Sequence, residues 1–370
     1  MERRPFGKTG LETSLLGFGG FHLLEIPARE GEVLLDRYLD AGGNYLETAA
    51  SYGNGESELK VGQVIKRRRG ECILTTKTLE RSRQGCLDSL DRSLHNLQTD
   101  HVDLLIMHAV GTMADLDKIL GPDGAMEGVH QAQRAGKVRH VGISMHGQPD
   151  TLIEALHRYP FDAVMPTVNY FDRCNFPEIE GTLLPLAQKK ETAVILMKPV
   201  ADGFLWRSAE QAFRYAMSQP VSVVVAGINT PDMLQQDLGW AESFRPMTEE
   251  EKEQLLRDAP ELGNYVCRQC GRCHGCTKGI DIPSVFRLEG YYDRQMRDGL
   301  VRDPAEFALR DRLRFWFGGQ NAARERYAKL AVKADQCDGC GNCSSCCPYG
   351  IDIPRKLAIA DYKLAGKKIF

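Results

Sequence analysis

Eight short apolar runs, separated by longer amphipathic stretches, constrain the fold of this chain more than any other feature of its sequence. The runs lie at residues 14–20, 44–48, 72–76, 102–108, 138–144, 163–169, 192–197 and 221–227. The amphipathic stretches lie at 30–41, 58–67, 83–97, 124–135, 149–158, 178–190 and 209–217. Strands that are apolar on both faces are typical of a parallel sheet covered by helices. Eight such units within roughly 250 residues favour a closed (β/α)8 TIM barrel over an open doubly wound sheet.

The open-sheet alternative lacks its usual dinucleotide-binding fingerprint. Gly17-Phe18-Gly19-Gly20 resembles the G-x-G-x-x-G turn only superficially. We therefore predict an α/β fold whose barrel occupies residues 1–247. Thr248 and Glu251 have the spacing of a capping box, which predicts the start of a helix. This helix is expected to open a small, mostly helical domain over residues 248–370, with a break at 316–319.

Charge and terminal sequence exclude some classes of protein. A formal net charge of −3 and a pI near 6.3 argue against a general nucleic-acid binder. The basic run Arg67-Arg68-Arg69 is interpreted as a solvated helix end or loop. The first five residues contain no apolar signal region, and no long apolar run predicts a membrane span.

Nine of the twelve cysteines lie in the last third of the chain, and eight of them form two matching runs. The first run is Cys267-x2-Cys270-x2-Cys273-x2-Cys276, and the second is Cys337-x2-Cys340-x2-Cys343-x3-Cys347-Pro348. Each run is soon followed by Gly-Ile-Asp-Ile-Pro, at 279–283 and at 350–354, which indicates an internal repeat. The second run has the spacing of a bacterial ferredoxin motif that holds a cubane iron–sulfur cluster. The sequence therefore predicts a ferredoxin-like domain with two [4Fe–4S] clusters.

In two-cluster ferredoxins the fourth cysteine of one run binds the other cluster. This exchange would place Cys347 with Cys267, Cys270 and Cys273, and Cys276 with Cys337, Cys340 and Cys343. Cys346 is left over by the spacing. Zinc and disulfides are weaker alternatives, because zinc sites usually separate two cysteine pairs and disulfides belong to secreted chains. Oxygen-sensitive clusters are expected in a reducing cytoplasm.

Polar residues follow the predicted strands where a (β/α)8 barrel carries its active site, at the carboxyl ends of the strands. They are Glu47 with Tyr52, Lys77, His108, Ser144 with His146, Asn169, Lys198, and Asn229 with Thr230. A lysine and a histidine that end apolar strands are costly to bury without partners. His146 is a candidate substrate contact, whereas His140 is read as structural.

Taken together, these segments resemble the aldo-keto reductase family, in the branch that carries a C-terminal ferredoxin-like domain. The resemblance rests on 7–11, 16–19, 44–53, 75–77, 102–108, 141–144 and 169–173 and covers almost the whole chain. The family's Asp-Tyr-Lys-His tetrad implies Tyr52 as general acid, Lys77 as its partner and His108 as the group that orients the carbonyl oxygen. A neighbouring ammonium is expected to lower the pKa of Tyr52. Glu47 stands where the family has aspartate.

The resemblance also implies a nicotinamide site that this chain matches only in part. Ser144 and Asn169 are retained, whereas Met145 and Met165 replace the family's Asn and Gln. We expect Lys198, Gly227, Asn229 and Thr230 to complete a cofactor site at the barrel mouth. The clamp for an NADP 2′-phosphate is absent, since residues 227–237 contain no basic residue.

A phosphate could still bind at a helix that starts at Thr230 and Pro231. NAD(H), NADP(H) and FMN therefore all stay open as cofactors. The leading hypothesis is an iron–sulfur oxidoreductase acting on a small carbonyl or hydroxyl compound, with the clusters relaying electrons. The alternative is a non-nicotinamide electron-transfer protein, or a flavin- or ferredoxin-coupled reductase, that serves another redox enzyme. The substrate, the direction of electron flow and the oligomeric state are not readable from the sequence.

Overall fold

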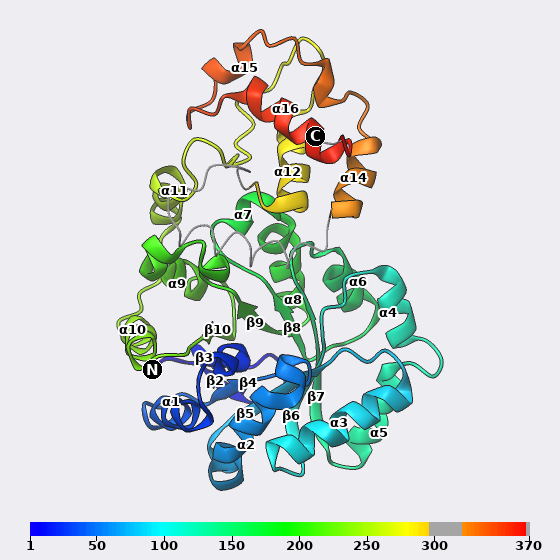
Figure 1. The fold of residues 1–370 in the computed structure, drawn as a ribbon, viewed down its shortest axis with the longest axis vertical. Coiled ribbons are helices and arrows are strands. Elements are labelled where there is room, and N and C mark those ends of the chain that lie inside the picture. The colour runs from blue at the N-terminus through cyan, green and yellow to red at the C-terminus, as the bar shows by residue number, and fades with distance from the viewer. Residues whose placement is uncertain (296–319, 368–370) are drawn as a thin grey trace.

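Eight parallel strands close into a barrel in this computed structural model, which describes residues 1–295 and 320–367 (Figure 1). The strands follow one another around the barrel in chain order, and β10 pairs with β3 to close it. They are β3 (Leu16–Gly19), β4 (Tyr45–Glu47), β5 (Ile73–Thr78), β6 (Val102–Met107), β7 (Val138–Met145), β8 (Ala163–Pro166), β9 (Ala193–Met197) and β10 (Val223–Gly227). Each predicted apolar run overlaps one of them, with β5 and β7 extending one or two residues beyond their runs, so the predicted barrel is confirmed.

Helices cover the outside of the barrel. The principal ones are α1 (Ala28–Asp40), α2 (Glu56–Arg68), α3 (Arg83–Leu97), α4 (Met113–Leu120), α5 (Ala125–Arg134), α6 (Asp150–Arg158), α8 (Leu184–Lys189), α9 (Ala209–Met217) and α10 (Pro231–Glu242). Side chains cap several of them: Ser82 begins α3, Thr112 begins α4 and Thr230 begins α10. The predicted start of α10 at Thr230 and Pro231 is confirmed.

A two-stranded hairpin, which the sequence analysis did not predict, closes the amino-terminal end of the barrel. It consists of β1 (Arg3–Pro5) and β2 (Glu12–Ser14). Phe6 directly follows β1, and its side chain packs inside the barrel, with its ring centroid 5.9 Å from that of Tyr45. Gly7 has a φ of +55° and lies so close to the start of β9 that a Cβ would be 2.5 Å from the Ala193 nitrogen.

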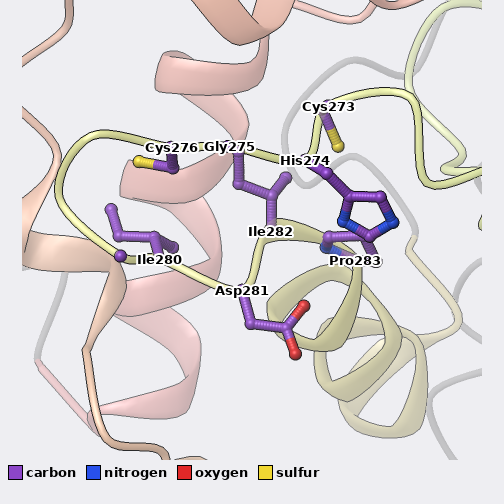
Figure 2. Close-up of a pocket in the computed structure, with 9 residues that line it drawn as sticks. Cys273, His274, Gly275, Cys276, Ile280, Asp281, Ile282 and Pro283 are labelled. Carbon is purple, nitrogen blue, oxygen red and sulfur yellow. The ribbon is translucent and has the colours of Figure 1, made fainter.

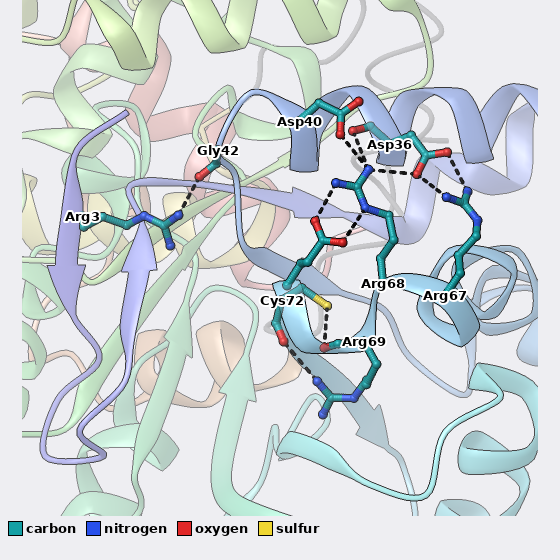
Figure 3. Close-up of polar contacts among 9 residues, drawn as sticks. Arg3, Asp36, Asp40, Gly42, Arg67, Arg68, Arg69 and Cys72 are labelled. Carbon is teal, nitrogen blue, oxygen red and sulfur yellow. Dashed lines mark hydrogen bonds and ion pairs between the residues drawn. The ribbon is translucent and has the colours of Figure 1, made fainter.

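The basic run at 67–69 lies at the end of α2, as predicted, and its charges are paired (Figure 3). Arg67 and Arg68 both bond to Asp36 on α1, and Arg69 bonds to the buried Asp103. This cluster joins α2 to its neighbours and offers no free basic patch.

A smaller, mostly helical C-terminal unit lies over the end of the barrel where the strands finish (Figure 1). Its described helices are α11 (Glu249–Asp258), α12 (Ile282–Asp293), α14 (Gln320–Ala328), α15 (Asn342–Ser345) and α16 (Ile353–Leu364). Thr248 and Glu251 form the predicted capping box of α11. The predicted break at 316–319 lies outside the described residues. Within the part of the chain that the structure describes, no helix has the length and apolar character that crossing a bilayer requires.

The internal repeat appears in the structure as two equivalent helices, α12 and α16. Each has 12 residues, follows a cysteine run and carries proline in its first turn. Asp281 caps α12 and Asp352 caps α16 in the same way, each accepting a bond from the backbone three residues on. The two helices pack against each other, so the two copies of the repeat form one body.

Candidate active site

Four of the predicted site residues meet at the carboxyl ends of neighbouring strands. Glu47 is the last residue of β4, Lys77 lies near the end of β5, and His108 directly follows β6. Tyr52 begins the short 3-10 helix Tyr52–Gly55 after β4. The structure therefore brings these four side chains together at one barrel mouth.

Lys77 is the centre of this group. Its Nζ donates to the Tyr52 hydroxyl at 2.9 Å and to the Thr48 carbonyl oxygen at 3.0 Å, and it forms an ion pair with Glu47. The Tyr52 hydroxyl also lies 3.4 Å from a Glu47 oxygen. Lys77 and Glu47 expose only 1% and 4% of their side chains. Glutamate in place of aspartate therefore keeps the contact with the lysine.

Burial sets the proton affinities at the site, and it overturns one expectation. Burial raises the pKa of Tyr52 above its usual value, so the predicted lowering by the Lys77 ammonium is wrong in this structure. Burial also lowers the pKa of Lys77 well below its usual value, while the adjacent Glu47 carboxylate favours the charged form. The phenol is thus protonated at neutral pH, the state that can donate a proton.

His108 is held as a neutral imidazole beside the phenol. Burial, together with the charges of Lys77 and Arg81, lowers the pKa of His108 to about 3. Its ring stands edge-on to Tyr52 with centroids 5.9 Å apart, and its Nδ1 lies 3.3 Å from the Ser51 hydroxyl. The His146 ring is 6.5 Å from that of His108, which brings the candidate substrate contact to the same mouth.

The residues expected to hold a nicotinamide are engaged within the protein. Ser144 accepts a bond from the Ala109 backbone nitrogen at 3.1 Å. The Asn169 amide group donates to Asp172 at 2.9 Å and to the Lys198 carbonyl oxygen at 3.1 Å, and its oxygen accepts from the Asp172 nitrogen. The Lys198 ammonium pairs with Asp202. Both amide hydrogens of the fully buried Asn169 are therefore used by neighbouring protein groups.

A carboxylate lies beside Asn229, two residues before α10 begins at Pro231. Asn229 donates to Glu25 at 2.6 Å, and His22 lies 3.2 Å from the same carboxylate. A Cβ at Gly227 would be 2.1 Å from the His22 ring, so the imidazole covers this glycine. Thr230 accepts a bond from the Met233 nitrogen, as an N-cap residue does. A negative charge next to a helix N-terminus competes with a bound phosphate.

The C-terminal unit contributes residues to the barrel mouth that the sequence analysis missed. Arg294, at the end of α12, lies 3.1 Å from Asp172 and 3.6 Å from Asp202 through its Nε and Nη1. Burial is the main cause that lowers the pKa of His146, and the nearby Lys198, His108 and Arg294 lower it further. The sequence does not show that Arg294 is buried at the mouth, because this depends on its pairing with Asp172 and Asp202, which are distant in the chain.

The second cysteine run includes α15, which lies at the end of the C-terminal unit away from the barrel (Figure 1). No disulfide joins any of the twelve cysteines, all of which lie in the described residues. Burial and the neighbouring Cys270, Cys343 and Cys347 raise the pKa of Cys273 to about 11. Cysteines of the two runs are therefore close to each other.

A hollow of about 300 Å³ lies at the first run (Figure 2). Cys273 and Cys276 line it together with His274 and the start of α12. Asp281, which caps α12, lines the same hollow, so Cys273 and Cys276 share it with a carboxylate.

The barrel is matched by known proteins, and the C-terminal unit is not part of the family match. The aldo/keto reductase family matches residues 15–211. The chain is 30% identical over 217 residues to an uncharacterised oxidoreductase, YqkF, of Bacillus subtilis, covering 55% of this chain and 67% of the relative. It is also 30% identical to L-galactose dehydrogenase of Arabidopsis thaliana, over 55% of this chain and 67% of that enzyme.

A solved structure agrees with these sequence matches. The holo form of an aldo-keto reductase from Bacillus halodurans has a TM-score of 0.61 and 27% identity, covering 69% of this chain and 95% of that one. Because the family match spans more than half of the 370 residues, the chain belongs to the aldo/keto reductase family and has the fold of an oxidoreductase.

Proposed function

We propose that this chain is an iron–sulfur oxidoreductase that interconverts a small carbonyl compound and its alcohol at the barrel mouth. The observation that carries the proposal is the contact of Lys77 with both Tyr52 and Glu47 in a family of oxidoreductases. The same chain supplies eight cysteines at cluster spacing, which supports electron delivery by [4Fe–4S] clusters.

The mouth residues perform the proton chemistry. Tyr52 donates a proton to the carbonyl oxygen, because its phenol is protonated at neutral pH. Lys77 stabilises the phenolate that remains, and Glu47 offsets the charge of Lys77. The neutral His108 orients the carbonyl oxygen by a hydrogen bond. Proton transfer by a positioned side chain contributes roughly 10²- to 10⁴-fold to a rate.

The cysteines fit two clusters in donor type and number. Cys267, Cys270, Cys273 and Cys347 would hold one cluster, and Cys337, Cys340, Cys343 and Cys276 the other. Cys273 lies near both Cys343 and Cys347 of the second run, so the exchange of the fourth ligands rests on the spacing of the two runs. When bound, the clusters supply electrons one at a time. Reduction of a carbonyl takes two electrons and two protons: Tyr52 gives the proton on oxygen, and solvent gives the proton on carbon.

A nicotinamide fits the described mouth poorly. The Asn169 amide is already used, the carboxylate of Glu25 bonds to Asn229 just before α10, and residues 227–237 contain no cation. These observations favour electrons from a low-potential one-electron donor, such as a ferredoxin, over NAD(H) or NADP(H). They also disfavour FMN, because its phosphate would meet the same carboxylate. They equally favour the second candidate, an electron-transfer protein that serves another redox enzyme.

Anaerobic purification followed by iron, sulfide and released-cofactor analysis tests the cofactors. A panel of small aldehydes and ketones is then offered to the wild type and to Tyr52→Phe, with reduced methyl viologen, NADH or NADPH as the donor. We expect about eight irons per chain and viologen-dependent turnover that falls by at least 10²-fold in Tyr52→Phe. Equal turnover in that variant would sink the proposed proton donor, and NADPH-dependent turnover would sink the proposed electron source.

A further inference from the structure

The two copies of the internal repeat differ where their helices end. Helices α12 and α16 share their length, their aspartate cap and their proline. Aligning Asp281 with Asp352 places Arg294 and Gln295 opposite Ala365 and Gly366. The first copy therefore carries two large polar residues at positions where the second copy has the two smallest residues. Copies of one unit diverge where only one of them has a particular contact to make.

Arg294 and Gln295 adopt a backbone conformation that suits them poorly. Their φ angles are +55° and +58°, in the left-handed region, whereas the second copy has Gly366 there at +67°. Both side chains are buried, at 2% and 1% exposure. A strained conformation persists only where surrounding contacts hold it, and such contacts cluster at functional sites.

The contacts of Gln295 join a cysteine run to the barrel. Its side-chain oxygen accepts a bond from the Cys267 backbone nitrogen at 2.7 Å. Its side-chain nitrogen donates to the Asn175 oxygen at 2.7 Å, on the short helix α7 (Asp172–Asn175) of the barrel. Gly290 allows this approach, because a Cβ there would be 2.4 Å from the same Asn175 oxygen.

Arg294 extends the connection toward the site. It pairs with Asp172, which bonds to Asn169 at the end of β8, and Asn169 bonds to the Lys198 carbonyl. The described hydrogen bonds and ion pair of the second run lie within the C-terminal unit: Cys340 bonds to Asp338, Cys346 bonds to Asn342, and Asp338 pairs with Lys278. The chain of contacts that reaches the mouth starts from Cys267 of the first run.

We propose that the cluster held by Cys267, Cys270 and Cys273 is the one that exchanges electrons with the barrel mouth, and that Gln295 is the positioning residue that couples them. This inference rests on the proposed function. With clusters bound, each transfer would move one electron. A ferredoxin-like donor would be oxidised as the cluster of the second run is reduced, that cluster would be oxidised as the cluster of the first run is reduced, and the latter would be oxidised as the compound in the mouth is reduced.

The alternative is that Gln295 only docks the C-terminal unit on the barrel, but other contacts already do this. Arg326 bonds to Asp150 at 2.6 Å, with about 40% of each side chain exposed. Arg287 and Tyr291 bond to Glu178. These contacts dock the C-terminal unit on the barrel without touching a cysteine run, so docking alone does not require a strained, buried junction.

The test measures the midpoint potential of each cluster in the full-length holoprotein by EPR-monitored redox titration. Gln295→Glu adds a negative charge beside Cys267 and is expected to lower one midpoint potential and leave the other in place. Asn175→Leu, a change within the barrel, is expected to shift the same midpoint. Arg326→Leu is the matched control, because it breaks a docking contact away from the cysteines, and it should shift neither.

Three outcomes would overturn the inference. They are equal shifts of both midpoints in Gln295→Glu, no shift in Asn175→Leu, and a shift in Arg326→Leu that matches the other two. If Gln295→Glu does not fold, Asn175→Leu still decides, since Gln295 is intact there. Wild-type protein without iron would overturn the proposed clusters themselves, whereas iron-replete protein with unresponsive midpoints overturns only the junction.

Discussion

At the scale of single residues, the burial of His108 beside Lys77 predicts that its imidazole stays neutral over the physiological pH range. Burial and the Lys77 charge hold the pKa of His108 at about 3. We expect the ¹³Cε1 signal of His108, assigned with His108→Asn, to stay at its neutral position from pH 8 to pH 5. In Lys77→Met the pKa should rise, because a positive charge that disfavours the imidazolium has gone. A wild-type transition near pH 6.5 would contradict the burial of this ring.

The sign of the effect on stability follows from the same pKa. In the unfolded chain the pKa of His108 is near 6.5, whereas in the folded chain it is about 3. Between these two pH values the unfolded chain binds a proton at His108 and the folded chain does not. The contribution of His108 to the free energy of unfolding is therefore complete above pH 6.5 and is lost as pH falls from 6.5 toward 3.

Glu47 makes a second prediction at this scale. Glu47→Gln leaves the buried Lys77 without its carboxylate, which costs about 3–5 kcal/mol for a buried pair that loses one partner. Glu47→Asp keeps the charge and should cost much less. Urea denaturation followed by barrel tryptophan fluorescence measures both variants. If the two variants lose equal stability, the shape of the side chain matters and its charge does not.

Residue types at the mouth were predictable, but their proton affinities were not. The order of Glu47, Tyr52, Lys77 and His108 along successive strands follows from the strand pattern, because parallel strands bring their carboxyl ends together. The direction of the Tyr52 pKa shift depends on how deeply the phenol is buried. That depth is a property of the packed mouth and has no local signal in the sequence.

At the scale of elements, a buried ion cluster holds α12 against α16. Glu289 on α12 is fully buried and bonds to Lys356 at 2.6 Å and to Lys363 at 3.1 Å, both on α16. Glu289→Leu leaves two buried ammonium groups without this carboxylate, so we expect the C-terminal unit to lose about 3–5 kcal/mol. Hydrogen exchange of α12 and α16 measures the loss.

The matched control lies on the neighbouring helix α11. Glu253→Leu removes an exposed carboxylate that lies 3.7 Å from Arg257 one turn along. Exposed pairs contribute about 0–1 kcal/mol. If this variant destabilises α12 and α16 as much as Glu289→Leu does, the buried cluster is not what joins the two helices.

Local signals predicted the elements that have them. The capping box at Thr248, the cap at Thr230 and the eight strands all follow from neighbours in sequence. The hairpin of β1 and β2 was missed because its strands have only three residues each and no alternating pattern. Its stability comes from packing against the barrel end, as the burial of Phe6 shows.

At the scale of the whole molecule, the repeat predicted that the two cysteine runs form one unit, but it did not predict which run faces the barrel. That orientation depends on Arg294 and Gln295 meeting Asp172 and Asn175, more than a hundred residues earlier. A contact at such a separation has no signal in a single sequence. The difference between the two copies can be read from the sequence, but the sequence does not say which barrel residues Arg294 and Gln295 contact.

The last prediction concerns the exchange of the fourth cysteine ligands between the two runs. If the fourth ligands are exchanged, Cys276→Ser removes a ligand from the cluster held mainly by 337–343, although Cys276 belongs to the first run. Cys347→Ser should do the reverse, and Cys346→Ser should retain all iron, because the exposed Cys346 already bonds to the Asn342 carbonyl. Iron content and EPR spectra of the three anaerobically purified variants distinguish the patterns. Iron loss in Cys346→Ser with retention in Cys347→Ser would reverse the ligand assignment, and with it the reading of the x3 spacing on which the assignment depends.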